Sequence, residues 1–222
     1  MRRYTAAIAV ALGGVVLLAT APSRAGERPP DLVADQCIER RLERFLEEQR
    51  REEARLRVEV SILDDDCGKT IQAVLVETPE GQISAKALAA EHIVVTRQIE
   101  RVLKESPEAS ETSLCTRIAL VDRLVSSVED PTLLELTERL KSLRLSPVLE
   151  PLLIVHGLQY DIRIESGISE ARFSFHAPGY PRPRTESLHP LDQWIGTLRE
   201  LLGLQCEHED QQRVQSSGVA EW

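Results

Sequence analysis

The sequence predicts an α+β fold: an antiparallel sheet built from two hairpin-like strand units, packed against several amphipathic helices and stapled by disulfides. Apolar residues alternate with polar ones in two separate regions, which is typical of strands that bury one face. In several other regions they recur at spacings of three and four, which is typical of helices that bury one side. Strands and helices occur in separate runs, and this segregation favours an antiparallel sheet.

Residues 1–25 are typical of a secretory signal peptide. Arg2 and Arg3 precede an apolar stretch, and the small residues Ser23 and Ala25 favour cleavage after Ala25. The apolar stretch is short for a membrane span of about 20 residues, so we favour a cleaved signal over an anchor. We therefore expect an exported bacterial protein, either periplasmic or extracellular.

We interpret residues 26–31 as a linker, 32–206 as a single α+β domain with a potential division into two subdomains near 106–112, and 207–222 as a disordered tail. The formal net charge is −9, and it becomes −12 after cleavage because the signal carries three arginines and no acids. An acidic chain argues against generic nucleic-acid binding and against binding to anionic membrane surfaces. No later segment is long and apolar enough to span a bilayer, so we expect no membrane span after cleavage.

The first half of the chain is predicted to contain a helix at residues 32–53, strands at 55–63 and 70–77, and a helix at 84–104. Apolar residues alternate in the first of these strands and follow helical spacing in both helices. The first helix ends in a run, residues 47–53, that is charged on all sides. Of two interpretations of this run, a partner-binding arm and a solvated helix end with local ion pairs, we favour the second.

The second half begins with a helix predicted at residues 114–128 from its apolar spacing. Asp130 and Pro131 then suit the N-cap and first turn of a further helix, which should end before Pro147. A short apolar run at residues 151–155 predicts a strand near the centre of the sheet.

The end of the chain is predicted to form a hairpin covered by a helix. Alternation at residues 158–164 and 171–175 predicts two strands with one apolar face, and Ser166-Gly167 supplies the turn. A lone hairpin is only marginally stable, so this face needs a cover. The helix predicted at residues 191–202 provides one, and Gly203 favours its termination. Its apolar stripe consists of Leu191, Trp194, Ile195, Leu198, Leu201 and Leu202.

The four cysteines that follow the signal are Cys37, Cys67, Cys115 and Cys206. An even number in an exported protein indicates two disulfides. A helix that rises about 1.5 Å per residue, followed by a strand that returns about 3.3 Å per residue, would bring Cys67 back beside Cys37. We therefore predict the bonds Cys37–Cys67 and Cys115–Cys206. A metal site at Cys206-Glu207-His208 is disfavoured, because no other metal-binding spacing accompanies it.

No phosphate-binding loop, nucleophile elbow or zinc-protease motif is present in the sequence. The best catalytic candidate is His156, which precedes a glycine at the end of an apolar run and lies near Tyr160. His92 lies on the apolar stripe of a predicted helix, so we interpret it as a packed core histidine. Asp64-Asp65-Asp66 lacks the alternation of a calcium loop and is interpreted as a turn. We expect no metal and no cofactor.

These features predict a non-enzymatic exported module that binds a protein or an envelope component. Its expected contact surface is the loop at residues 178–184, with Tyr180, Arg182 and Arg184, because this loop is a basic patch on an acidic chain. Two alternatives stay open. One is a small-molecule carrier with a pocket near Trp194, and the other is a hydrolase that uses His156.

Overall fold

The computed structural model describes residues 29–65, 67–143, 157–178 and 190–205, which contain five helices and six strands. The helices are α1 (Pro30–Arg50), α2 (His92–Glu105), α3 (Glu111–Arg117), α4 (Thr132–Ser142) and α5 (Pro190–Leu201). The strands are β1 (Leu56–Asp64), β2 (Lys69–Glu77), β3 (Ile83–Glu91), β4 (Val121–Ser126), β5 (Gly157–Ser166) and β6 (Ser169–Pro178).

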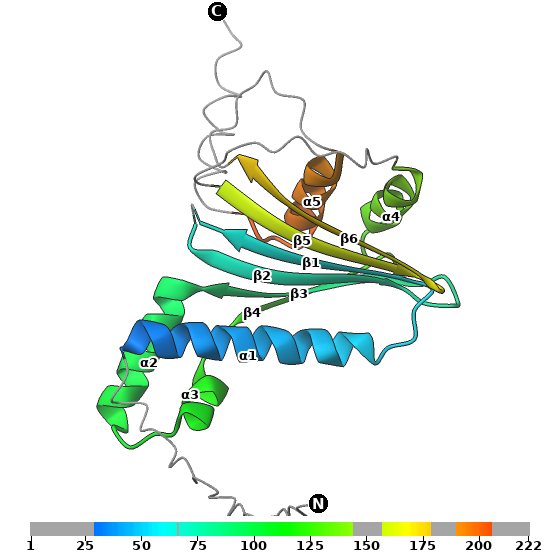
Figure 1. The fold of residues 1–222 in the computed structure, drawn as a ribbon. Coiled ribbons are helices and arrows are strands. Elements are labelled where there is room, and N and C mark those ends of the chain that lie inside the picture. Colours follow the sequence, from blue (N-terminus) through cyan, green and yellow to red (C-terminus); the bar gives the residue numbers. More distant parts are fainter. Residues whose placement is uncertain (1–28, 66, 144–156, 179–189, 206–222) are drawn as a thin grey trace, which may run out of the picture.

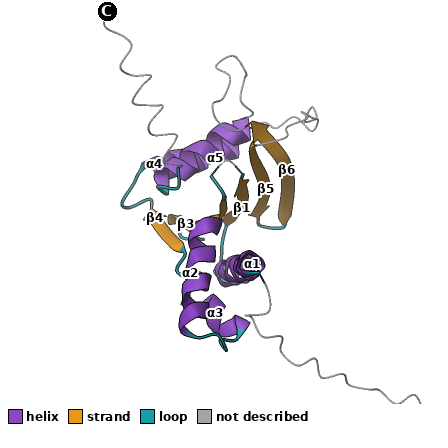
Figure 2. Cartoon of the chain, turned by 90° about the vertical axis from the view of Figure 1, so that its left-hand side faces the viewer, coloured by secondary structure: helices purple, strands orange, loops and turns teal. Residues whose placement is uncertain are grey.

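The strands form one sheet in the order β4-β3-β2-β1-β5-β6, and every neighbouring pair is antiparallel. Helices α4 and α5 lie on one face of the sheet, and α1, α2 and α3 lie on the other (Figures 1 and 2). The predicted α+β class is confirmed. The two predicted strand units are joined into a single sheet because β1 pairs with β5.

The face toward α4 and α5 forms the larger apolar core. The predicted cover helix is α5, and its stripe residues Trp194 and Leu198 are buried against the sheet. Polar atoms inside this core are bonded: Trp194 Nε1 donates to the Leu136 carbonyl oxygen over 2.8 Å, and the Tyr160 hydroxyl donates to Asp192 Oδ1 over 3.1 Å. Each bond avoids the roughly 1–3 kcal/mol that an unsatisfied buried polar group costs.

The opposite face forms a second apolar core, in which α1 packs against α2, α3, β2 and β3. Val33, Cys37 and Leu42 of α1 are buried there, together with Leu114 and Cys115 of α3. A disulfide joins Cys37 to Cys115 with an S–S distance of 1.99 Å. The bond links the first helix of the described chain to a helix 78 residues later.

The observed disulfide overturns both predicted pairings, Cys37–Cys67 and Cys115–Cys206. The rotation of α1 about its axis explains the difference. Cys37 lies on the stripe that packs with α3 in the second core. Cys67 lies in the turn after β1, where its N–H donates to Asp64, and Asp64 is bonded to α5 on the other side of the sheet. The rise of the helix and the return of the strand are therefore no guide to pairing, because Cys37 is buried between α1 and α3, whereas Cys67 is bonded through its backbone to a residue that contacts α5.

Cys67 is also disulfide-bonded. With Cys37 and Cys115 joined, Cys206 is the remaining cysteine of the sequence, and it lies outside the described residues. A buried contact joins Arg199 of α5, which precedes Cys206 in the sequence, to Asp64 at the end of β1, which precedes Cys67. We therefore predict that non-reducing digestion and mass spectrometry of the purified protein will yield a Cys67–Cys206 peptide beside the Cys37–Cys115 one. Recovery of a peptide that joins Cys37 to Cys67 would contradict this assignment.

Two predicted helices are partly wrong. The helix expected over residues 84–104 begins only at His92, and the residues before it form β3. Alanine and leucine favour helix locally, but β3 is paired on both sides and largely buried, and small side chains fit between two helical layers. The helix expected over residues 114–128 is replaced by the short α3 and the edge strand β4. Sheet pairing overrides local propensity in both segments.

We predicted that residues 47–53 form a solvated helix end with ion pairs inside the run. The ion pairs instead join the run to the sheet. Arg50 binds Glu59 of β1 with a shortest distance of 2.6 Å, and Glu52 binds Lys86 of β3 at 2.5 Å. These ion pairs connect α1 and the residues after it to the sheet. Among the described helices, none combines the length and apolar character that a bilayer crossing requires.

Candidate functional site

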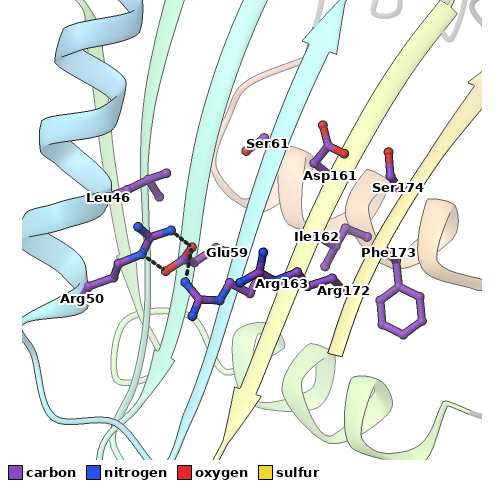
Figure 3. Close-up of a pocket in the computed structure, with 10 residues that line it drawn as sticks. All are labelled: Leu46, Arg50, Glu59, Ser61, Asp161, Ile162, Arg163, Arg172, Phe173 and Ser174. Carbon is purple, nitrogen blue, oxygen red and sulfur yellow. Dashed lines mark hydrogen bonds and ion pairs between the residues drawn. The ribbon is translucent and has the colours of Figure 1, made fainter. Parts of the chain in front are cut away.

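The sheet face beside α1 carries a cavity of about 620 Å³ (Figure 3). α1 packs on β2 and β3, so the same face of β5 and β6 lies next to the helix. The cavity is lined by Leu46, Arg50, Glu59, Ser61, Asp161, Ile162, Arg163, Arg172, Phe173 and Ser174. The side chains of Ile162 and Phe173 belong to the core on the other face. The cavity is therefore a polar groove with strands as its floor and a helix as one wall.

The strand register arranges this floor in two rows. Ser61, Asp161 and Ser174 lie opposite one another on β1, β5 and β6. The next row lies two residues further along each strand and consists of Glu59, Arg163 and Arg172. The first row carries hydroxyl groups and a carboxylate, and the second carries mainly guanidinium groups.

The second row is held by ion pairs around Glu59, whose side chain is only 6% exposed. Arg50 donates two hydrogen bonds to this carboxylate, over 2.8 and 2.6 Å, and the bonds raise the pKa of Arg50. Arg163 lies 3.9 Å from Glu59 and also binds Glu165 at 2.5 Å and Glu170 at 3.1 Å. Its hydrogen bond to Glu170 is the main cause that raises the pKa of Arg163. These arginines stay charged and are bound to carboxylates of the protein.

Asp161 differs from its charged neighbours in the groove. It is exposed, and it has no hydrogen bond or ion pair among the described residues. The groups opposite it are the hydroxyls of Ser61 and Ser174 rather than cations. Its carboxylate is therefore available to a cation or a hydrogen-bond donor that enters the groove.

A second cavity, of about 350 Å³, continues the groove toward the start of α1. It is lined by Asp35, Ile38, Glu39, Leu42, Glu43, Leu46, Thr70, Gln72 and His92. Leu46 lines both cavities. Their floors are connected by a hydrogen bond of 2.7 Å that Ser61 Oγ donates to Gln72 Oε1. One polar groove thus runs along the side of α1.

His92 lies at the end of this second cavity. Its Nδ1 is 2.9 Å from Asp35 Oδ1, and its Nε2 is 2.9 Å from Thr70 Oγ1. The expected packed core histidine is therefore wrong, since the side chain is 36% exposed and hydrogen-bonded on both nitrogens. The reason is that β3 occupies the residues before His92, so His92 is the first residue of α2 rather than a residue inside a longer helix.

The two described residues among those proposed from the sequence, Tyr160 and Trp194, do not line this groove. Tyr160 is fully buried on the other side of the sheet, with its ring 5.0 Å from that of Phe175. Trp194 is also fully buried there. The catalytic candidate His156, the signal-cleavage residue Ala25 and the contact-loop residues Tyr180, Arg182 and Arg184 lie outside the described residues.

One sequence signal could have located the groove. The alternation that predicts β5 places Gln159, Asp161, Arg163 and Glu165 on the face away from the core, and a charged strand face next to a helix is a candidate surface. The partners of His92 could not be found in this way, because Asp35 and Thr70 come from other elements.

The described residues contain no group of three or more histidine, cysteine, aspartate or glutamate side chains suited to a metal ion. Asp65 lies in the turn after β1, as predicted, whereas Asp64 is the last residue of that strand and binds Arg199. Asp66 lies outside the described residues. Comparison of the chain with family models, with curated proteins and with solved structures found no match.

Proposed function

We propose that the protein is an exported binding module that holds an extended, basic peptide segment of a partner protein in the groove beside α1. The observation that carries the proposal is Asp161, a carboxylate that has no partner among the described residues, on a floor whose other charges are paired. Ion pairs on the floor fix its shape before a ligand arrives, which reduces the entropy that binding costs. The disulfide between Cys37 and Cys115 is consistent with an oxidising compartment and so supports export.

The length and charge of the groove favour a peptide over a compact small molecule. Two connected cavities run along α1, and an extended chain can occupy both. Glu39 and Glu43 line the second cavity and are exposed, as Asp161 is in the first. The whole chain carries a formal net charge of −9. A basic segment would therefore be attracted over a distance and then bind carboxylates directly.

The loop at residues 178–184 is proposed as an additional contact. β6 forms part of the groove floor and ends at Pro178, so this loop follows the groove directly in sequence. Its Arg182 and Arg184 would bind acidic residues of the partner that flank the basic segment. If charge reversal of both arginines leaves partner affinity unchanged, the loop is not a contact.

The proposal is tested by selecting peptides from a displayed random library with the mature, disulfide-bonded protein. We expect the selection to enrich peptides with lysine or arginine, and Asp161→Lys to weaken their binding at least tenfold. Asp122→Lys is the matched control, because Asp122 is an exposed strand carboxylate on β4, at the other edge of the sheet. Equal loss of binding in both variants, or selection of peptides without basic residues, would refute the proposed site.

A further inference from the structure

Three side chains from three separate elements form a chain of hydrogen bonds at the end of the second cavity. Asp35 comes from α1, His92 from the start of α2, and Thr70 from β2. Asp35 Oδ1 lies 2.9 Å from His92 Nδ1, and Thr70 Oγ1 lies 2.9 Å from His92 Nε2. When Nδ1–H donates to the carboxylate, the lone pair on Nε2 is left to accept the threonine proton. This is the order of orienting acid, base and nucleophile that hydroxyl-dependent acyl transfer requires.

The backbone holds this arrangement in place. The N–H of His92 donates to the carbonyl oxygen of Gly68 over 3.0 Å, just before β2. Thr70 is paired with Ala90 in the β2–β3 ladder, two residues before His92. The base and the nucleophile are thus fixed by one pair of strands, and α1 adds the carboxylate. Part of the His92 ring remains exposed, so water can reach it.

Gln72 supplies a donor for the charge that acyl transfer creates. It lies two residues after Thr70 on β2, so both side chains project from the same face and line the same cavity. Its oxygen accepts the hydrogen bond from Ser61, over 2.7 Å, which fixes the orientation of the amide. The amide nitrogen has no hydrogen-bond partner among the described residues. A side-chain amide of this kind can stabilise a developing oxyanion.

We infer that Thr70, His92 and Asp35 form a catalytic triad that hydrolyses carboxylic esters, with Gln72 as the oxyanion donor. Thr70 Oγ1 attacks the ester carbonyl carbon while its proton passes to His92 Nε2, and the carbonyl electron pair moves to the oxygen that Gln72 binds. The tetrahedral intermediate expels the alcohol oxygen, which takes the proton from His92. Water then attacks the acyl-threonine, giving its proton to His92. Collapse of the second intermediate releases the carboxylic acid and returns the proton to Thr70.

The lining of the cavity indicates the class of ester. Ile38, Leu42 and Leu46 form an apolar wall on α1, which suits a short hydrocarbon acyl group. The volume of about 350 Å³ is sufficient for a small acyl group. Glu39 and Glu43 on the same helix disfavour an anionic alcohol part. A neutral ester such as p-nitrophenyl butyrate is therefore a suitable probe.

The experiment measures both a covalent adduct and turnover, because a purely structural hydrogen-bond chain would give neither. The mature, disulfide-bonded protein is treated with a fluorophosphonate and digested, and p-nitrophenyl butyrate hydrolysis is followed separately. We expect the adduct on Thr70, and a loss of turnover of at least 100-fold in Thr70→Val and in His92→Gln. Gln72→Ala should lower kcat by about 100-fold, as loss of an oxyanion donor does. Thr70→Ser should retain activity.

Thr197→Val is the matched control, since Thr197 is a half-buried threonine on α5, and α5 lies on the other face of the sheet from α1 and this cavity. Valine has the shape of threonine and favours strands, so Thr70→Val should fold. Absence of an adduct on Thr70, or equal turnover in wild type and Thr70→Val, would overturn the inference. Either result would leave the peptide-binding proposal intact, because that proposal rests on Asp161 in the other cavity.

Discussion

Replacing Arg199 by leucine is expected to lower the free energy of unfolding by about 3–5 kcal/mol. Arg199 Nη2 lies 2.9 Å from Asp64 Oδ2, and the two side chains are only 4% and 2% exposed. The pair joins α5 to the end of β1, beneath the turn that contains Cys67. Without Arg199, the Asp64 carboxylate would stay buried next to an apolar side chain. Urea unfolding monitored by circular dichroism measures the loss.

A second variant separates the cost of burying the Asp64 charge without Arg199 from the loss of packing. Asp64→Asn removes the charge and keeps an oxygen that can accept the Cys67 N–H. The double variant, Arg199→Leu with Asp64→Asn, should therefore recover a large part of the stability that Arg199→Leu alone loses. The exposed pair Lys86–Glu52 serves as the control, because breaking a surface ion pair costs about 1 kcal/mol or less. If Arg199→Leu costs no more than Lys86→Met, the buried pair does not hold α5 to the sheet.

The parts of the fold that could be predicted from sequence are those with strong local signals. The hairpin of β5 and β6 has strict alternation and a Ser166-Gly167 turn, and Gly167 has the positive φ of 58° that such a turn requires. α5 has a complete apolar stripe and ends before Gly203, which has a φ of 62°. α4 begins at Thr132, with Pro131 rather than the predicted Asp130 at the N-cap position. Asp130 accepts a hydrogen bond from the Thr132 N–H, and hydrogen bonding to Thr132 lowers the pKa of Asp130.

Other parts depend on contacts between segments that are distant in sequence. β3 contains alanine, lysine and leucine, which favour a helix, and its strand conformation comes from pairing with β2 and β4. The groove depends on the same kind of information, because Asp161 and Ser174 become neighbours only through the register of β5 and β6. The triad brings together residues that are 57 and 22 positions apart. No spacing rule within one element could reveal it.

Removal of the Cys37–Cys115 disulfide is expected to have the second large effect on the stability of the protein. Replacing both Cys37 and Cys115 by alanine should lower the free energy of unfolding by about 4 kcal/mol, because the bond closes a long loop in the unfolded chain. The two residues it joins are 78 positions apart. Both cysteines are nearly or fully buried in the second core, where alanine leaves only a small void. Urea unfolding of the variant, compared with the oxidised wild type, gives the difference.

The location of the Cys37–Cys115 disulfide predicts which elements lose the most stability when it is removed. Cys37–Cys115 holds α1 to α3, whereas the core between the sheet and α5 has its own apolar contacts and the Asp64–Arg199 pair. Amide hydrogen exchange in the alanine variant should therefore accelerate more in α1 and α3 than in β1, β5 and α5. Because α1 carries Asp35 and Leu46, the same variant should also loosen the wall of the groove. Uniform acceleration in every element would show instead that the two cores unfold as one unit.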